Sequence, residues 1–438
     1  MSYAVARSRG ANADQNKLSQ EDRGVHEWYR FVLSFPPHLV REYLARFDVH
    51  EQSRVLDPFC GTGTTIVEAK KLGIPSLGLE GNPLARYAAQ VKVNWEIDPG
   101  GLLEHANAVA QKARARLHES GISDAGESTE HLPELPLRSL RTEQQALLLK
   151  GSISPLPLHK SLVLLECLDQ ASDQRYHDHE RIAFAKSVVS SSSNLHFGPE
   201  VGVGPAKPNA PVIGPWLAGV EAMARDLWWT PRSSTAAAEV RQADARTPGG
   251  IEAGSIDAVF CSPPYPNEKD YTRATRLESV LLGFIRDKAE LRALKKGLLR
   301  SNTRGVYKDD VDDAWVATHG EIQRLAGEVE ARRVELGKTS GFERMYSRVI
   351  KLYFGGMARH LTELRALLKP GARLAYVVGD QASFFQVLIR TGTLLAEIAE
   401  SLGYELDGID LFRTRLATAT RAQLREEVVV LRWPGKLL

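Results

Sequence analysis

The segment "RVLDPFCGTGTTIVEAKKLG" (residues 54–73) decides the fold, because it joins a short apolar strand to a helix through a turn that contains two glycines. The segment "PSLGLEGNPLARYAAQ" (75–90) repeats the arrangement, with an expected strand at 76–79, an acid at Glu80 and a helix. Strands that alternate with helices are typical of parallel sheets with crossover helices. The sequence therefore predicts an α/β fold.

The alternation stops near residue 100 and resumes with "EVRQADAR" (239–246) and "SIDAVF" (255–260). Three more strands are expected at 374–380, 404–412 and 425–433, and no good helix lies between the last two. Longer helices are expected at 101–118, 158–172, 346–368 and 386–402. Seven strands in this order predict an open, mostly parallel sheet that ends with an antiparallel strand.

The composition divides the chain into a main domain with two insertions. Residues 1–25 are polar and contain glycine, so we expect a flexible N-terminal tail. The main domain is expected to comprise 26–100 and 236–438, with a large inserted region at 101–235 and a second, helical insertion at 270–345. The stretch 197–216 is dense in glycine and proline, which excludes a helix or a central strand there.

Bulk properties exclude several classes of protein. The 438 residues carry 56 Lys and Arg against 54 Asp and Glu, so any basic binding surface has to be local. Cys60, Cys167 and Cys261 are widely spaced and odd in number, which indicates a reducing compartment. The chain has neither a long apolar run nor the apolar core of a signal peptide, so we expect a soluble, cytoplasmic protein. "HDHE" (177–180) is the only local metal candidate, and a solvated helix face is the favoured interpretation, so no metal is expected.

The glycine-containing turn "DPFCGTGTT" (57–65) is the first candidate for a binding site. In open parallel sheets ligands bind beyond the carboxyl ends of the strands. Gly61 and Gly63 allow the backbone to approach a ligand closely, and Thr64 and Thr65 are expected to cap the following helix. A plain strand-to-helix turn is the alternative interpretation.

Acids stand at the ends of three expected strands, at Asp57, Glu80 and Asp244. They suit a ligand that carries hydroxyls, amino groups and positive charge, and they would repel a polyphosphate. No GK[ST] sequence follows the glycine turn at 57–65, which disfavours a nucleoside triphosphate there, and the absence of a GxGxxG helix start disfavours a nicotinamide cofactor.

The stretch "CSPPYPNEKDY" (261–271) follows a buried strand and ends it, because proline cannot donate to a sheet ladder. Pro263 and Pro264 have fixed φ angles that direct backbone carbonyls outward, Ser262 offers a hydroxyl, and Tyr265 offers an aromatic face. A structural Pro-Pro turn with a buried tyrosine is the alternative.

A basic and aromatic patch follows. Lys269, Arg273 and Arg276, with Tyr271 between them, could hold phosphates, or the arginines could pair with Glu268, Asp270 and Glu278.

"DPFCGTGTT", "GLEGNP" and "SPPY" together resemble the S-adenosylmethionine-dependent amino-methyltransferases of DNA, most closely the group that methylates the exocyclic N4 of cytosine. The resemblance implies a Rossmann-like methyltransferase sheet, S-adenosyl-L-methionine as cofactor, double-stranded DNA with a flipped target base, and a possible restriction endonuclease partner. It implies that Glu80 binds the ribose hydroxyls, that Asp244 meets the adenine amine, and that the Asp57–Gly63 loop wraps the methionine end. The implied cofactor-binding set is Asp57, Pro58, Phe59, Cys60, Gly61, Gly63, Thr64, Glu80, Asn82 and Asp244.

The resemblance also implies a catalytic set: Ser262, Pro263, Pro264 and Tyr265. A cytosine amine is a poor nucleophile, and acceptors aimed at its N–H groups would take up developing positive charge. Tyr265 would stack on the extruded base. Related enzymes that act on adenine N6 mostly carry Asp or Asn at the position of Ser262. Methylation of adenine N6, methylation of a base amine in RNA, and non-catalytic nucleic-acid binding remain open.

The two insertions are candidates for target recognition, with 150–235 expected to contact bases. Trp228 and Trp229 lie just after its glycine-rich loop and are alternatively buried anchors. In the second insertion the most basic stretch is 291–308, where phosphate contact is expected from Arg292, Lys295, Lys296, Arg300, Arg304 and Lys308.

Overall fold

The computed structural model describes residues 18–30, 34–125, 136–198, 200–230, 236–267, 269–416 and 423–435. Its main sheet has seven strands in the order β5-β2-β1-β6-β7-β9-β8, and every strand pair is parallel except those made by β9. The strands are β1 (Val55–Asp57), β2 (Ser76–Glu80), β5 (Ala238–Gln242), β6 (Ile256–Cys261), β7 (Leu368–Gly379), β8 (Glu405–Leu416) and β9 (Gln423–Arg432). The predicted α/β sheet is confirmed. The antiparallel strand lies between β7 and β8.

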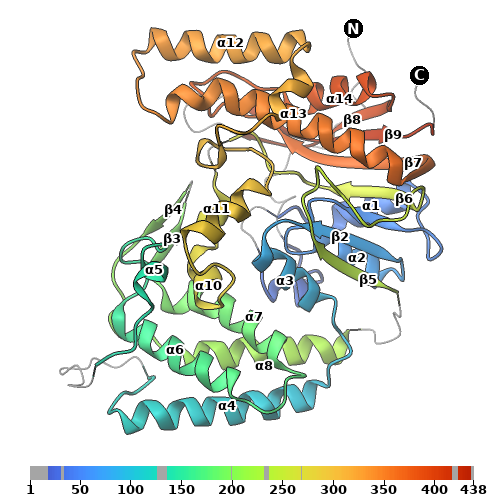
Figure 1. The fold of residues 1–438 in the computed structure, drawn as a ribbon. Helices are drawn as coiled ribbons and strands as arrows, with labels where there is room; N and C mark the ends of the chain where they lie inside the picture. The colour runs from blue at the N-terminus through green and yellow to red at the C-terminus, as the bar shows by residue number, and fades with distance from the viewer. Residues whose placement is uncertain are drawn as a thin grey trace.

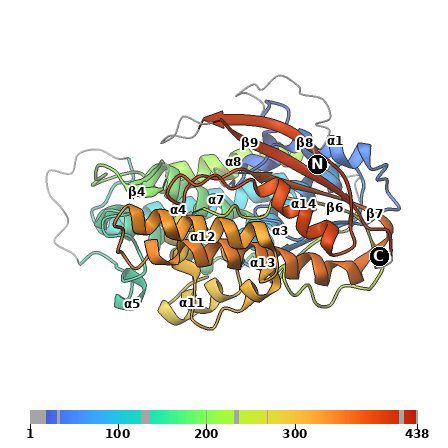
Figure 2. The same ribbon diagram turned by 90° about the horizontal axis from the view of Figure 1, so that it is seen from above.

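Helices cover both faces of the sheet, because successive side chains of a strand point to opposite sides. On β6, Ala258 and Phe260 face α1 (Pro37–Arg46) and α2 (Thr64–Lys71), whereas Val259 and Cys261 face α13 (Tyr346–Leu364) and α14 (Thr391–Ser401). Figure 1 shows these layers, and Figure 2 shows β8 and β9 running side by side with α12 alongside α13.

The first insertion forms a helical layer beside the sheet (Figure 1). Its helices pack on one another around a buried core that includes Leu164, Phe184 and Trp216. Two short strands make a separate antiparallel hairpin. The helix α3 (Pro83–Lys92) precedes this layer. The elements of the layer are α4 (Pro99–Glu119), α5 (Thr142–Gln145), α6 (Pro155–Asp169), α7 (His177–Ser187), β3 (Leu195–Phe197), β4 (Val201–Val203) and α8 (Ile213–Trp229).

The second insertion is also helical and bridges the two halves of the molecule in Figure 1. It consists of α9 (Tyr271–Ala274), α10 (Arg276–Leu281), α11 (Lys288–Lys296), two short 3-10 helices, η4 (Thr303–Gly305) and η5 (Asp312–Val316), and α12 (Gly320–Glu335). No helix in the described part of the chain is both long and apolar enough to cross a membrane.

The structure corrects the expected start of order at residue 26. Asp22 and Val25 are buried, and Arg41 donates to Asp22 Oδ1 over 2.7 Å, so part of the expected tail packs onto α1. Residues 1–17 lie outside the described residues. The glycine- and proline-rich stretch contributes the β3–β4 hairpin away from the main sheet, but its end is helical. Pro215 stands in the first turn of α8, where no amide donor is needed.

One predicted solvated face is buried, and one alternative interpretation is excluded. The "HDHE" segment begins α7, yet His179 and Glu180 are fully buried, because α7 packs into the core of the first insertion. Among the described residues no group of three or more His, Cys, Asp or Glu is placed to hold a metal ion. Conversely, Trp228 and Trp229 are 54% and 88% exposed, so they are not buried anchors. They lie at the end of α8, beyond its packed face.

Candidate active site

Strand pairing brings the two candidate loops together. β1 pairs in parallel with β6, with Val55 opposite Ala258 and Leu56 opposite Val259, so the carboxyl ends of both strands meet. The chain continues from β1 to β2 and β5 on one side, while β6 and β7 lie on the other. The strand order therefore reverses between β1 and β6, which is where open α/β sheets bind ligands.

At this point lies a cavity of about 670 Å³, within the range of small-molecule sites. It is lined by the β1 loop, by the end of β2 and by the turn that follows β6. The lining includes all four expected catalytic residues and eight of the expected cofactor residues: Pro58, Phe59, Cys60, Gly61, Thr64, Glu80, Asn82 and Asp244. Asp57 and Gly63 are not among the lining residues.

Gly63 fixes the turn from β1 into α2. It has a φ of 87° and occupies the N-cap position of α2, and a Cβ there would come within 2.9 Å of Ala89 Cβ. Only glycine fits this conformation and this close approach. The expected capping by Thr64 and Thr65 is therefore wrong, because both already belong to the helix. Thr65 Oγ1 instead donates to the carbonyl of Phe260 on β6 over 3.2 Å.

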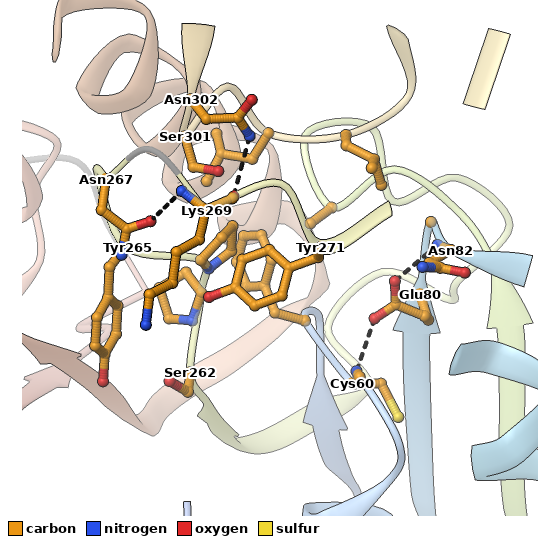
Figure 3. A pocket seen from close by; sticks show the side chains of 18 of the residues that line it. Cys60, Glu80, Asn82, Ser262, Tyr265, Asn267, Lys269, Tyr271, Ser301 and Asn302 are labelled. Atoms are coloured by element: carbon orange, nitrogen blue, oxygen red, sulfur yellow. Dashed lines mark hydrogen bonds between the residues drawn. The ribbon is translucent and has the colours of Figure 1, made fainter. Parts of the chain in front are cut away.

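Glu80 holds the two loops at the carboxyl ends of β1 and β2. Its Oε2 accepts from the amide of Gly61, and its Oε1 accepts from the amide of Asn82, both over 2.7 Å (Figure 3). Burial raises the pKa of Glu80 and the backbone donors oppose that shift. Asn82 caps α3 by accepting from the amide of Leu84, so its side chain already has a structural role. Glu80 thus faces the cavity in a fixed orientation.

Asp57 lies beneath this loop and is fully buried. Its Oδ1 accepts from the amide of Phe59 over 3.0 Å, whereas Oδ2 has no hydrogen-bond partner in the described part of the chain. Burial is the main cause that raises the pKa of Asp57 to about 7. An unsatisfied buried oxygen is costly, and this atom has no access to the cavity, because Asp57 is not among the residues that line it.

Asp244 lies two residues beyond β5 and lines the cavity, but its carboxylate is already engaged. Arg246 donates to both of its oxygens, with Nε 3.0 Å from Oδ1 and Nη2 2.7 Å from Oδ2. No motif in the sequence indicates this pairing. A carboxylate has further lone pairs, so an adenine amine would share Asp244 with Arg246.

The turn after β6 places Ser262, Pro263, Pro264 and Tyr265 on the opposite side of the cavity from Glu80. Ser262 Oγ donates to the carbonyl of Val377 on β7 over 3.0 Å. The ring of Tyr265 packs against Gly379, where a Cβ would come within 2.9 Å of it. The Ser262 proton is thereby committed to the protein, and the lone pairs of its oxygen remain as acceptors.

The structure divides the expected nucleic-acid patch. Lys269 and Tyr271 line the cavity, and Figure 3 shows the Tyr271 ring between Ser262 and Glu80. Arg273 and Arg276 do not line it. Arg276 Nε donates to the carbonyl of Thr272 over 2.9 Å and its Nη1 to that of Leu147 over 3.4 Å, so Arg276 ties two segments together. Glu268 lies outside the described residues.

Several cavity residues carry no motif that sequence reasoning could have found. Ser301 and Asn302 come from the second insertion, and Asn302 Nδ2 donates to the carbonyl of Lys269 over 3.2 Å. Arg415 and Glu426 reach the cavity from β8 and β9. These residues meet the motif residues only through long-range packing. The apolar pattern of β8 and β9 was the one available signal, and it places strands rather than side chains.

His360 is a buried residue that packs behind the residues lining the cavity. It is fully buried, and its ring nitrogens lie 2.8 Å from the carbonyl of Ala245 and 2.8 Å from the hydroxyl of Tyr376. Its ring also packs edge-on against Phe59, with ring centres 5.0 Å apart. Burial lowers the pKa of His360 to about 4. The histidine therefore holds the Asp244 loop and the β1 loop in its neutral form.

This burial makes stability depend on pH. Below the ordinary pKa of about 6.5 the unfolded chain takes up a proton at His360, whereas the native chain does so only near pH 4, so stability is lost as pH falls through this window. We expect the difference in unfolding free energy between wild type and His360→Gln to shrink by up to about 1.4 kcal/mol per pH unit between 6.5 and 4. Urea denaturation at several pH values measures it. A difference that stays constant over this range would contradict a neutral buried His360.

Comparisons with known proteins agree with this geometry. A family model described as DNA methylase, N6_N4_Mtase, matches residues 10–90, which include the β1 loop and Glu80. Type II methyltransferase M.BsoBI of Geobacillus stearothermophilus is 24% identical over 426 residues, covering 88% of this chain and 80% of the relative. Type II methyltransferase M.AvaI of Nostoc sp. is 22% identical over 444 residues, covering 95% of this chain and 88% of the relative.

Another relative matches over a shorter segment with higher sequence identity. Type II methyltransferase M.MjaII of Methanocaldococcus jannaschii is 37% identical over 79 residues, which cover 17% of this chain and 14% of the relative. The family model, these relatives and the cavity between the β1 loop and the turn after β6 support an amino-methyltransferase of the DNA N6/N4 group, whose members use S-adenosylmethionine.

Proposed function

We propose that the protein methylates the exocyclic N4 amine of cytosine in double-stranded DNA. The observation that carries this proposal is the position of Ser262, which lines the same cavity as Glu80 and whose proton is donated to Val377. The Ser262 oxygen can therefore only accept, and an exocyclic amine is the donor that it fits. Pro263 and Pro264 cannot donate either, so the turn offers acceptors to the amine.

Lys269 favours cytosine over adenine. Figure 3 shows its side chain extending toward Ser262, and within the described part of the chain the Lys269 ammonium has no hydrogen-bond or ion-pair partner. Its backbone is fixed on both sides, by Asn267 Oδ1 over 3.0 Å and by Asn302 Nδ2 over 3.2 Å. On its Watson–Crick edge, cytosine presents two acceptors besides the N4 amine, ring N3 and the carbonyl O2, whereas adenine presents only ring N1 there. A cation beside the serine acceptor matches the cytosine edge.

The cavity fits the cofactor. The bound cofactor supplies a methyl group that its positive sulfonium already activates. Glu80 would hold the two ribose hydroxyls, and Asp244 the adenine amine in company with Arg246. Asp57 lies beneath the loop that would wrap the methionine end and would support that loop from the protein interior. The acidic character of this side of the cavity also disfavours a polyphosphate ligand.

On the substrate side, Ser262 would orient the amine and take up positive charge as it develops. The Pro263 and Pro264 carbonyls would accept from the second N–H. Tyr265 and Tyr271 offer aromatic faces for an extruded base, and both line the cavity. Alignment of the amine with the methyl group is then the main contribution of the chain to the rate.

The two insertions, 101–235 and 270–345, would form the walls of the DNA cleft around a catalytic domain made of 26–100 and 236–438. The second insertion contributes Ser301 and Asn302 to the cavity, and the first contributes Glu200. The relatives are named Type II methyltransferases, so we further propose a modification role beside a restriction endonuclease.

The test is a transfer assay with S-adenosylmethionine labelled in its methyl group and with unmethylated bacterial DNA or total RNA as acceptor. Digestion to nucleosides and mass spectrometry identify the product. We expect N4-methylcytosine from DNA. N6-methyladenine in the DNA digest would overturn the cytosine assignment, and labelling of RNA alone would overturn the DNA assignment.

A further inference from the structure

Two arginines of the second insertion converge on one carboxylate of the first. Arg273 Nη1 lies 3.9 Å from Glu200 Oε2, and Arg304 Nη1 lies 3.6 Å from the same oxygen. Arg273 belongs to α9, Arg304 to η4, and Glu200 stands in the turn between β3 and β4. Three segments distant in the sequence thus meet at a single anionic atom.

This meeting point adjoins the cavity. Glu200 lines it, and so do Thr272 and Gly305, the chain neighbours of Arg273 and Arg304. The pair of arginines therefore stands beside the place that the proposed function gives to an extruded base. A nucleotide that enters a pocket brings its flanking phosphates to such a position.

The distances from Glu200 to the two arginines are longer than the ion-pair distances within the second insertion. Lys295 lies 2.6 Å from Asp270 and Arg300 lies 2.7 Å from Asp310, and all four of these side chains are largely buried. Lys295 and Arg300 of the basic stretch 291–308 are therefore neutralised within the second insertion, which corrects the expectation that they contact phosphate. Lys296 is likewise paired with Asp309, over 2.5 Å.

Arg273 and Arg304 differ from Lys295 and Arg300. Their side chains are 30% and 31% exposed, and the Glu200 side chain is 47% exposed. Arg273 Nε is buried without a hydrogen-bond partner in the described part of the chain. Both arginines therefore keep donors for an anion with more than one oxygen, which is the geometry that a phosphodiester offers.

We propose that Arg273 and Arg304 form a binding site for a backbone phosphate of the target DNA strand, and that Glu200 holds this site until the phosphate displaces it. The proposal rests on the proposed function for the identity of the nucleic acid. Exposed pairs of this kind contribute little, so the exchange of one anion for another is readily reversible. The Phe197 side chain, 40% exposed on the same hairpin, adds an apolar surface next to the exchange point.

The test measures the affinity for a short fluorescent duplex with one mismatched cytosine, which is extruded at lower cost than a paired one. We expect Glu200→Gln to tighten binding about fivefold, because the competing anion is gone. We expect Arg304→Gln to weaken binding and to reduce the slope of log affinity against log salt by about one. The matched control is Glu321→Gln, which removes the same charge from an exposed pair with Arg324 on α12.

A double-mutant cycle separates the exchange from a general charge effect. In a background of Arg273→Gln and Arg304→Gln, the further change Glu200→Gln should leave the affinity unchanged. Three results would overturn the proposal. The first is an equal gain in DNA affinity from Glu200→Gln in that background, and the second is an equal gain in DNA affinity from Glu321→Gln. The third is DNA binding by Glu200→Gln alone that is unchanged or weaker than that of the wild type. Absence of methyl transfer to DNA together with the expected cycle would overturn the proposed function and leave the phosphate site standing.

Discussion

Ser262→Ala is expected to lower the rate of methyl transfer at saturating substrates about a hundredfold, while the affinity for S-adenosylmethionine changes less than about twofold. The substitution removes the oxygen that would accept from the target amine, and loss of one such polar contact in a transition state typically costs a hundredfold or more, roughly 3 kcal/mol. The cofactor contacts lie across the cavity, at Glu80 and the β1 loop, so they should persist. Single-turnover kinetics measures the rate and calorimetry the affinity.

The control is Ser401→Ala, which removes a hydroxyl that also donates to a backbone carbonyl, that of Ile398, but at the end of α14. Its rate should equal that of the wild type. A Ser262→Ala enzyme that transfers methyl groups within about threefold of the wild-type rate would contradict the acceptor role of Ser262. A parallel loss of cofactor affinity would show that Ser262 supports the fold of the whole cavity instead.

Glu80→Ala is expected to have the opposite profile, with cofactor affinity lowered about a hundredfold and the rate at saturating cofactor largely kept. The change removes the acceptor of the ribose hydroxyls and also leaves the amides of Gly61 and Asn82 without their 2.7 Å partners. Each hydrogen bond to a charged group contributes about 1.5–3 kcal/mol, so the loss of two ribose contacts reaches at least a hundredfold. Calorimetric titration with S-adenosylmethionine measures the effect.

Glu80→Gln keeps the shape and one carbonyl oxygen, so it should fall between wild type and Glu80→Ala and serves if the alanine variant is unstable. Glu239→Ala is the control, because Glu239 is exposed on the neighbouring strand β5 and pairs with Arg241. Its cofactor affinity should match the wild type. Retention of cofactor affinity in both Glu80 variants would contradict the assignment of the ribose to Glu80.

The sheet could be predicted from the sequence because each strand carries a local signal. Val55–Asp57 and Ile256–Cys261 are short apolar runs ended by glycine- or proline-containing turns, and such punctuation fixes where a strand stops. The two halves of the cavity follow from the same reasoning, since carboxyl ends of parallel strands share one edge. The proximity of Glu80 and Ser262 could therefore be predicted from the sequence.

The predictions that failed concern side chains whose partners and exposure are decided by the folded structure. Asp244 looked free in the sequence, but Arg246 engages both of its oxygens. Arg300 looked like a phosphate ligand, but it is buried against Asp310. Trp228 and Trp229 lie outside the packed face of α8, which only the arrangement of the neighbouring helices decides. The residue type shows which ligand contacts a side chain can make, and packing decides whether the side chain is free to make them.

A crystal structure with an S-adenosylmethionine analogue that carries an amine in place of the methylsulfonium tests the central claim most directly. The account predicts the ribose hydroxyls at Glu80 and the amine, which marks the position of the methyl group, facing the Ser262–Pro263 turn within a few ångströms. An analogue bound with that amine turned away from Ser262, or bound outside the cavity between β1 and β6, would contradict it.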